Sequence, residues 1–224
     1  MSAIGTLNEG SLHAALKAHY ARPGDAFEVP HEGFVIDIVR DAGGPAELFI
    51  EIQTGSFRAM GRKLDRLLEA HRIKLVYPVA LRTVLERDGR RRASPKKGSV
   101  YSLFDELVSI PTLLDHPSLE LDLVSVEVTK HQVPDPRARR GRGGWRTVDR
   151  QLDAIVDVWC FTDMVDVWRL VTGELPDRFT TAHLAGAAGV DRGRAQQMAY
   201  CFNAANLIDQ VGRTRDGKIY RVTL

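Results

Sequence analysis

Two acidic residues inside apolar runs are the residues of this sequence best suited to chemistry. Asp37 lies within residues 34–39 and Glu51 within residues 47–53, and both runs are rich in the β-branched and aromatic residues typical of strands. The turn-forming residues 41–45 between them predict a hairpin. If the hairpin is symmetric about its turn, residues that face each other have numbers that sum to 88, so Asp37 faces Glu51.

Facing acids of this kind predict a metal site. The Cβ atoms of directly opposed residues lie about 4.5–5.5 Å apart, so the two carboxylates repel each other unless a cation lies between them. A divalent cation is the simplest such partner, because hard cations bind carboxylate oxygens. The alternation of a strand adds Gln53 to the same face. The alternatives are that each acid is an exposed edge residue and that Gln53 only hydrogen-bonds across the sheet.

The neighbouring elements must position this pair. We expect a first amphipathic helix that ends near Tyr20 and carries Glu9 in its first turn. After a short strand and the hairpin, residues 57–70 are expected to form a helix with Arg62 and Lys63 on its basic flank. Residues 73–81 read as a buried strand, and a helix between strands implies a crossover connection and a mixed sheet.

Asp37, followed across a hairpin by Glu51-Ile-Gln53, resembles the core of the PD-(D/E)XK (restriction-endonuclease-like) nuclease superfamily, over roughly residues 5–85. The resemblance implies an α/β nuclease core in which Asp37 and Glu51 hold Mg²⁺ or Mn²⁺ and Glu9 completes the metal shell. Gln53 stands where the motif has lysine, as in variant members, and would orient the attacking water. Lys63, with Arg62 as its competitor, would supply the positive charge.

Two of these residues also have a purely structural interpretation. Glu9 can be a first-turn acid that is favourable against the helix dipole. Lys63 can be an exposed helix charge.

The distribution of charge indicates a polyanionic partner. The 224 residues have a net charge of only +2, but residues 87–97 and 137–150 each carry +5 and residues 178–224 carry +4. The rest of the chain is therefore at −12. Positive charge concentrated in three segments suits a polyanion better than it suits general solubility.

Several classes of protein are not indicated. No apolar run is long enough to span a membrane, and the N-terminus lacks the basic and apolar regions of a secretory signal. Cys160 and Cys201 are isolated and lie in no metal-ligand spacing. We therefore expect a cytoplasmic protein with reduced thiols and no membrane partner.

The expected division of the chain is a nuclease-like domain over residues 1–133, a basic Arg/Gly linker or loop over 134–150, and a connecting element with a second domain over 151–224. In the linker, Arg140 and Arg142 with Trp145 suit a nucleic-acid backbone and a stacked base. The alternative is a disordered linker without a partner.

From residue 179 the sequence predicts a short helix, a tight turn, a longer helix over 192–205 and a basic hairpin over 207–222. This order resembles a winged helix-turn-helix module over about residues 176–224. The resemblance implies that the second helix enters the major groove of DNA and that the hairpin is the wing. The expected contact residues are Arg192, Arg194 and Gln197 on the helix and Arg213, Arg215 and Lys218 on the wing. Winged helices also bind proteins, which stays the alternative.

Together these features favour a metal-dependent deoxyribonuclease that is targeted by its C-terminal module. A DNA-binding regulator or scaffold that has lost catalysis is a second hypothesis. An RNA-processing nuclease is a third, since nothing in the sequence distinguishes RNA from DNA. A homodimer would suit double-strand cleavage.

Overall fold

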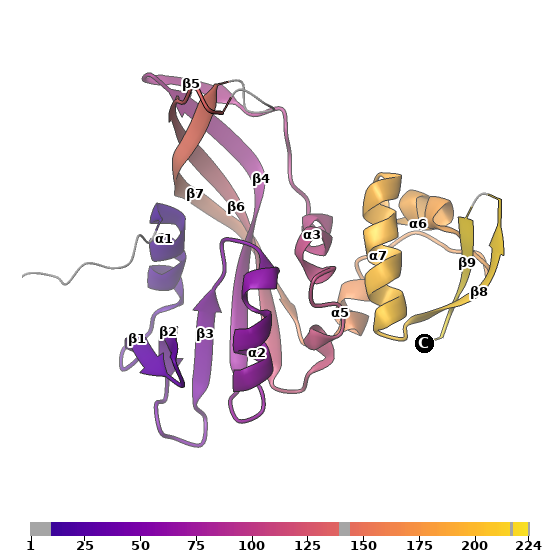
Figure 1. Cartoon of the computed structure of the whole chain (residues 1–224), viewed down its shortest axis with the longest axis horizontal. Coiled ribbons are helices and arrows are strands. Elements are labelled where there is room, and N and C mark those ends of the chain that lie inside the picture. Colours follow the sequence, from indigo (N-terminus) through magenta and orange to yellow (C-terminus); the bar gives the residue numbers. More distant parts are fainter. Residues whose placement is uncertain (1–9, 139–143, 216, 224) are drawn as a thin grey trace, which may run out of the picture.

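The computed structural model describes residues 10–138, 144–215 and 217–223. They form a mixed α/β fold built on a seven-stranded sheet, with helices on both faces and a small two-stranded sheet near the C-terminus (Figure 1). The strand order of the large sheet is β1-β2-β3-β4-β6-β7, and β5 pairs with β4 off this path. The pairs β3–β4 and β4–β6 are parallel and the others antiparallel, so the predicted mixed sheet is confirmed.

The first half of the chain forms the part of the sheet that carries the two acids. Its elements are α1 (Ser11–Tyr20), β1 (Ala26–His31), β2 (Phe34–Arg40), β3 (Leu48–Ile52), the 3-10 helix η1 (Phe57–Ala59), α2 (Gly61–Leu67) and β4 (Ile73–Arg87). The β2–β3 hairpin has the predicted register, because Ile38 faces Ile50 and Val39 faces Phe49. The helical crossover from β3 makes β4 parallel to it, also as predicted.

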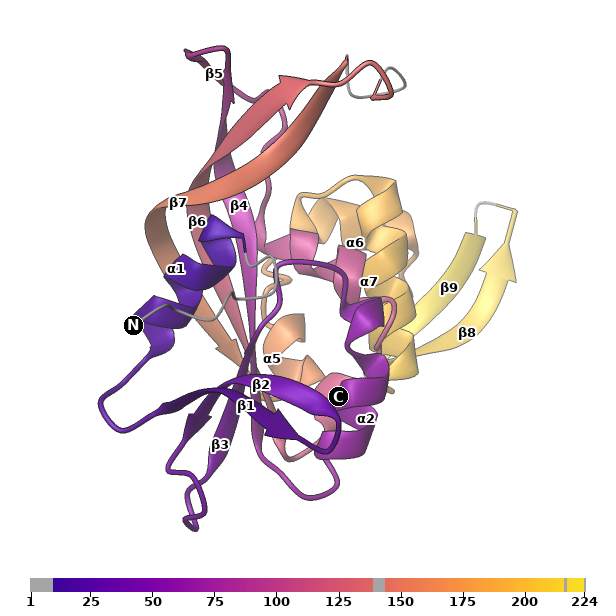
Figure 2. The same cartoon turned by 60° about the vertical axis from the view of Figure 1, so that its left-hand side comes forward.

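The second half adds long strands that leave the body of the sheet. Its elements are β5 (Arg90–Ala93), the 3-10 helix η2 (Val100–Leu103), α3 (Phe104–Leu107), the 3-10 helix η3 (Leu113–Asp115), β6 (Leu119–Pro134) and β7 (Trp145–Phe161). The far ends of β4, β6 and β7 project with β5 beyond α1 and α3 (Figure 2). We name this projection, residues 82–93, 127–134 and 145–154, the arm.

Both basic segments contribute strands to the large sheet. Residues 87–97 include β5, which pairs with β4. The expectation for the other segment needs correction. The expected linker 134–150 already contains the start of β7, which pairs with β6 along its length up to Phe161. The large sheet therefore continues past the expected boundary at residue 133.

Apolar residues cover both faces of the sheet. On one face Leu12 and Leu16 of α1 pack against isoleucine and valine side chains of β2, β3, β4 and β6. On the other face lie α2, α3 and the C-terminal helices, on the side away from α1 (Figure 2). Burial on both faces explains why the central strands read as nearly continuous apolar runs rather than alternating ones.

The C-terminal elements pack into the apolar core on the α2 side of the sheet. They are α5 (Met164–Trp168), α6 (Thr181–Ala188), α7 (Arg192–Ala204), β8 (Ile208–Thr214) and β9 (Gly217–Val222). Thr180 caps α6 through its side chain, and Gly189 ends that helix in the left-handed conformation. The ring of Phe202 packs edge-on against Phe104 and Trp168, which joins α7 to the sheet side of the molecule. None of the helices in the described ranges is long and apolar enough to cross a membrane.

Candidate active site

Asp37 of β2 and Glu51 of β3 lie just beyond the paired residues of their hairpin. Asp37 Oδ2 accepts a hydrogen bond from the backbone N–H of Ile52 at 2.7 Å, so this carboxylate bridges the two strands. Its Oδ1 lies 3.2 Å from Nε2 of His13 on α1. Glu51 is only 5 % exposed, and its Oε1 lies 2.6 Å from Nζ of Lys63 on α2. Helices from both faces of the sheet thus supply the partners of the two acids.

The two carboxylates have pKa values that are shifted in opposite directions. Burial raises the pKa of Glu51 to about 7, against the stabilising charge of Lys63, and the negative charge of Asp37 adds to the increase. Burial also acts on Asp37, but hydrogen bonds from His13 and from the Ile52 N–H prevail and hold its pKa below the usual value. Sites of acid–base catalysis often contain two titratable groups whose pKa values are shifted apart by their environments.

The side chain of Lys63 contacts Glu51, whereas the side chain of Gln53 bonds to the turn after β3. Besides Glu51, Lys63 Nζ donates to the carbonyl oxygen of Val35 at 2.6 Å. Arg62, its expected competitor, is exposed. The Gln53 side chain donates through Nε2 to the carbonyl oxygen of Ser56 at 2.7 Å, so its amide group holds the turn that follows β3. Glu9 lies outside the described residues.

Asp37 and Glu51 offer a metal ion two carboxylates. In the described ranges no three His, Cys, Asp or Glu side chains gather into a metal-binding group. Two carboxylates nevertheless fit Mg²⁺, which commonly binds one or two protein carboxylates and keeps water or substrate oxygens as its other ligands. Glu51 Oε1 is buried and has no hydrogen bond of good geometry with any described residue. Its partner is the Lys63 ammonium group, which compensates the charge of the carboxylate as an ion pair.

Sequence reasoning missed His13 and Lys17. Lys17 helps to lower the pKa of Asp37 and forms an ion pair with Glu28 of β1. The signal was present, because residues 9, 13 and 17 follow the four-residue spacing that places side chains on one face of a helix. The imidazole and the ammonium group then reach the acids only because α1 packs across β2 and β3.

The expected contact residues of α7 divide into two groups. Arg192 is exposed and lines a groove of about 380 Å³ between α7 and the β8–β9 hairpin, together with Gln196, Tyr200, Arg213 and Lys218. The turn residue Arg215 is exposed as well.

Arg194 and Gln197 were expected to face outward and contact DNA, but their side chains face the protein instead. Both donate to the carboxylate of Asp105 on α3, at 2.8 Å and 3.2 Å. Burial would raise the pKa of Asp105, but these two hydrogen bonds prevail and lower it. The two side chains therefore fasten α7 to the sheet side of the molecule.

The residues expected in the basic linker are only partly described. Trp145 begins β7, and the guanidinium of Arg87 lies over its ring at 4.8 Å from the centroid. Arg140 and Arg142 fall outside the described residues.

The fold and the site define a mixed α/β protein with a pair of facing acids, of which Glu51 is buried and Asp37 partly buried. The chain belongs to the family described as Domain of unknown function (DUF8091), whose model matches residues 10–162, from just before α1 to just past β7. A protein of Treponema pallidum (strain Nichols), named "Uncharacterized protein", is 31% identical over 188 residues, which cover 81% of this chain and 73% of that protein. No solved structure matches the chain.

Proposed function

We propose that this protein is a metal-dependent nuclease that hydrolyses phosphodiester bonds of DNA, with its active site at Asp37 and Glu51. The observation that carries the proposal is the meeting of these two acids on neighbouring strands with the Lys63 ammonium 2.6 Å from Glu51. The elements around them, from α1 to β4, occupy about the same residues as the PD-(D/E)XK resemblance. Carboxylates beside one basic side chain are suited to phosphoryl chemistry.

In this proposal Asp37 and Glu51 would hold Mg²⁺ or Mn²⁺. When bound, the ion would polarise the phosphate and lower the pKa of the attacking water. Asp37 keeps its negative charge because His13 and the Ile52 N–H stabilise it. Lys63 would offer its ammonium group to the negative charge that develops on the phosphate, since it already lies at the site and is held by the Val35 carbonyl. Gln53 acts through the turn after β3, where it donates to Ser56.

The C-terminal elements would position the substrate as a winged helix-turn-helix module. In support, α6 and α7 are joined by a tight turn at Gly189, and the β8–β9 hairpin borders the same groove as α7. Arg192 and Gln196 would read base edges, because they are the exposed polar residues of α7 that line this groove. Arg213 and Lys218 on the hairpin would contact phosphates.

A second candidate function is a DNA-binding scaffold without catalysis. The observation that favours it is that the existing side chains already satisfy much of the site: Lys63 pairs with Glu51, and His13 contacts Asp37. The motif lysine is also replaced by Gln53, whose amide is engaged in a turn.

One assay separates these functions. The protein is incubated with supercoiled plasmid, linear duplex DNA and structured RNA, each with Mg²⁺, with Mn²⁺ and with a chelator. Metal-dependent cleavage of DNA is the expected result. Cleavage of RNA alone would identify an RNA-processing nuclease, and binding of DNA without cleavage under every condition would identify the scaffold.

A further inference from the structure

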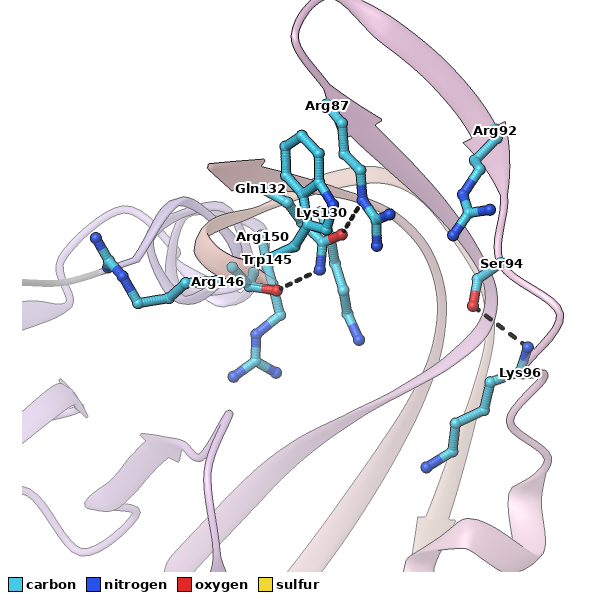
Figure 3. Close-up of a pocket in the computed structure, with 10 residues that line it drawn as sticks. Arg87, Arg92, Ser94, Lys96, Lys130, Gln132, Trp145, Arg146 and Arg150 are labelled. Atoms are coloured by element: carbon cyan, nitrogen blue, oxygen red, sulfur yellow. Dashed lines mark hydrogen bonds between the residues drawn. The ribbon is translucent and has the colours of Figure 1, made fainter. Parts of the chain in front are cut away.

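The arm contains a basic pocket of about 900 Å³ that brings two distant segments of the sequence together. Five of its basic lining residues come from the two segments that each carry +5, residues 87–97 and 137–150: Arg87, Arg92, Lys96, Arg146 and Arg150. Lys130 of β6 adds a sixth. Figure 3 shows Arg87, Arg92 and Lys130 extending from strands, and Lys96 from the loop after β5, around one shared space. Arg150 lies beside them and Arg146 points away at the rim. The pairing of β6 with β4 and β7 creates this convergence.

The positive charge of the pocket is not neutralised by its own walls. No acidic residue lines it among the described residues. Arg87 donates to the neutral amide oxygen of Gln132. Lys96 donates its backbone N–H to Ser94 Oγ, but no described residue forms a hydrogen bond or ion pair with the Lys96 ammonium group or the Arg92 guanidinium. Burial, together with the charges of Arg150 and Lys96, lowers the pKa of Lys130.

The neighbouring Arg91 shows the contrast, since alternate residues of a strand face opposite sides. Its guanidinium lies 3.6 Å from the carboxylate of Glu86 and donates to Thr129, which in turn donates to Asp153. On the Arg91 side of the arm the cation is therefore paired with acids. Of the cations that line the pocket, Arg146 forms an ion pair with Asp135 at 3.5 Å, whereas the charges of the others are left for an anion.

The pocket is connected to the candidate active site. Arg150 Nη1 lies 3.4 Å from the carbonyl oxygen of Thr54, in the turn that follows Gln53. A smaller cavity of about 300 Å³ is lined by His13 and Thr54, which are near the acids, and by Thr147 and Arg150 of β7. Its lining also includes Asp149, whose carboxylate accepts hydrogen bonds from Ser11. Thr147 and Arg150 also line the basic pocket. A chain that passes the acids can thus continue directly into the arm.

We propose that this pocket binds the phosphodiester backbone of a single nucleic-acid strand that extends from the Asp37–Glu51 site. Its volume is at the upper end of the range for compact ligand pockets, which suits a few nucleotides of one strand rather than a turn of duplex. Cations on several walls can contact successive phosphates, and Trp145 offers an aromatic edge at the rim. The inference rests on the proposed function for the identity of the substrate, but binding can be measured without catalysis.

The test measures binding of fluorescent single-stranded DNA, single-stranded RNA and duplex DNA by the full chain, in chelator and at several salt concentrations. Arg92→Gln and Lys96→Gln each remove one charge from an exposed side chain and should leave the fold intact, which thermal unfolding verifies. Each should weaken binding several-fold and make the log–log salt slope shallower by about 0.7, because one phosphate contact is lost. Arg22→Gln removes an equal charge from the exposed loop between α1 and β1 and should change neither value.

Loss of affinity on either strand supports the proposal and shows whether the strand is DNA or RNA. Unchanged affinity and slope in the Arg92→Gln/Lys96→Gln double variant would overturn it, and so would an equal loss in Arg22→Gln. A double variant that loses affinity for duplex but not for single strands would also overturn it. If the wild type cleaves nothing in Mg²⁺ yet the pocket variants lose binding, the proposed function fails and the pocket stands. If the variants cleave DNA fully and bind single strands as tightly as wild type, the proposed function stands and the pocket proposal fails.

Discussion

At the scale of single residues, the two acids differ in how the fold stabilises their charge. Asp37 receives hydrogen bonds from His13 and from the Ile52 backbone, whereas buried Glu51 depends on the ion pair with Lys63. A cation that binds between them would favour the ionised form of Glu51. Metal binding and proton release by Glu51 are therefore expected to be coupled.

The free energy of unfolding should fall as the pH rises from about 4.5 to about 7, because of Glu51. Its pKa is about 7 in the folded protein against 4.5 for an unperturbed glutamate, so in this window the folded protein holds a proton that the unfolded chain has released. The full difference corresponds to roughly 3 kcal/mol. Asp37, whose pKa is lowered from 3.8, gives stability that is lost only as the pH falls below this window.

Denaturant unfolding of wild type and Glu51→Gln at several pH values measures this effect. The stability of Glu51→Gln relative to wild type should increase with pH across the window. Glu69→Gln, which changes an exposed acid after α2, is the matched control and should follow the wild-type curve. If the stability of wild type and Glu51→Gln depended on pH in the same way, the raised pKa of Glu51 would be contradicted.

Replacement of Lys63 should reduce cleavage more than it reduces folding. Lys63→Ala should lower the cleavage rate by roughly ten- to a thousandfold if the ammonium group stabilises charge in the transition state. Protonation of Glu51 limits the cost of leaving it without its partner, so the variant should still fold. Arg62→Ala, which removes an exposed charge from the preceding position, is the control. Cleavage rates are measured under single-turnover conditions. Equal rates for the two variants would show that Lys63 has only a structural role.

The pairing of the acids was predictable from sequence, but most of their partners were not. The register that opposes Asp37 and Glu51 depends on a short hairpin and its turn, which are local signals. His13 reaches Asp37 only through the packing of α1 on the sheet, and Arg194 meets Asp105 only through the docking of α7 on α3. Such contacts join residues far apart in the chain, and alternation along an element does not encode them.

At the scale of elements, α7 has one side that docks on the protein and one side that faces the groove. Arg192 and Arg194 are two residues apart and carry the same charge, so they form a matched pair for testing this division. Arg192→Ala should weaken DNA binding and alter its sequence preference, with little change in thermal stability. Arg194→Ala should instead lower stability by about 1 kcal/mol, because the ion pair with half-exposed Asp105 is partly screened by solvent.

Binding to several duplexes and thermal unfolding, measured for both variants, checks this prediction. A loss of sequence preference in Arg194→Ala at unchanged stability would show that this residue reads DNA and that the docked position of α7 is not the functional one.

The arm shows where element prediction failed. Glycine and arginine residues around position 140 indicated a linker, yet Trp145 already pairs across from Pro134 in the sheet. The strand is stabilised by its partner β6 and by the contact of Trp145 with Arg87, and neither is visible in local composition. Local propensity is a weaker determinant of a strand than its cross-strand neighbours.

At the scale of the whole molecule, the sheet and the C-terminal helices should unfold as one unit. Phe202 of α7 is fully buried between Phe104 of α3 and Trp168 of α5, in a core that continues to the sheet. Phe202→Ala should destabilise the whole chain by about 3–5 kcal/mol, as other large truncations in cores do. Calorimetry should show a single transition that moves to lower temperature. Two transitions, of which only one moves, would show that the C-terminal module folds independently.

Cleavage by a single isosteric pair of variants tests the central claim most directly. Asp37→Asn removes the charge of one proposed metal ligand, and Asp41→Asn makes the same change at an exposed turn residue of the same hairpin. Cleavage of plasmid DNA in Mg²⁺ should fall by at least about a hundredfold in Asp37→Asn, since metal and transition-state charge are both affected, and should be unchanged in Asp41→Asn. Mg²⁺ should raise the thermal stability of wild type and Asp41→Asn but not of Asp37→Asn. Metal-dependent cleavage by Asp37→Asn at the wild-type rate would show that the chemistry does not occur at this pair of acids.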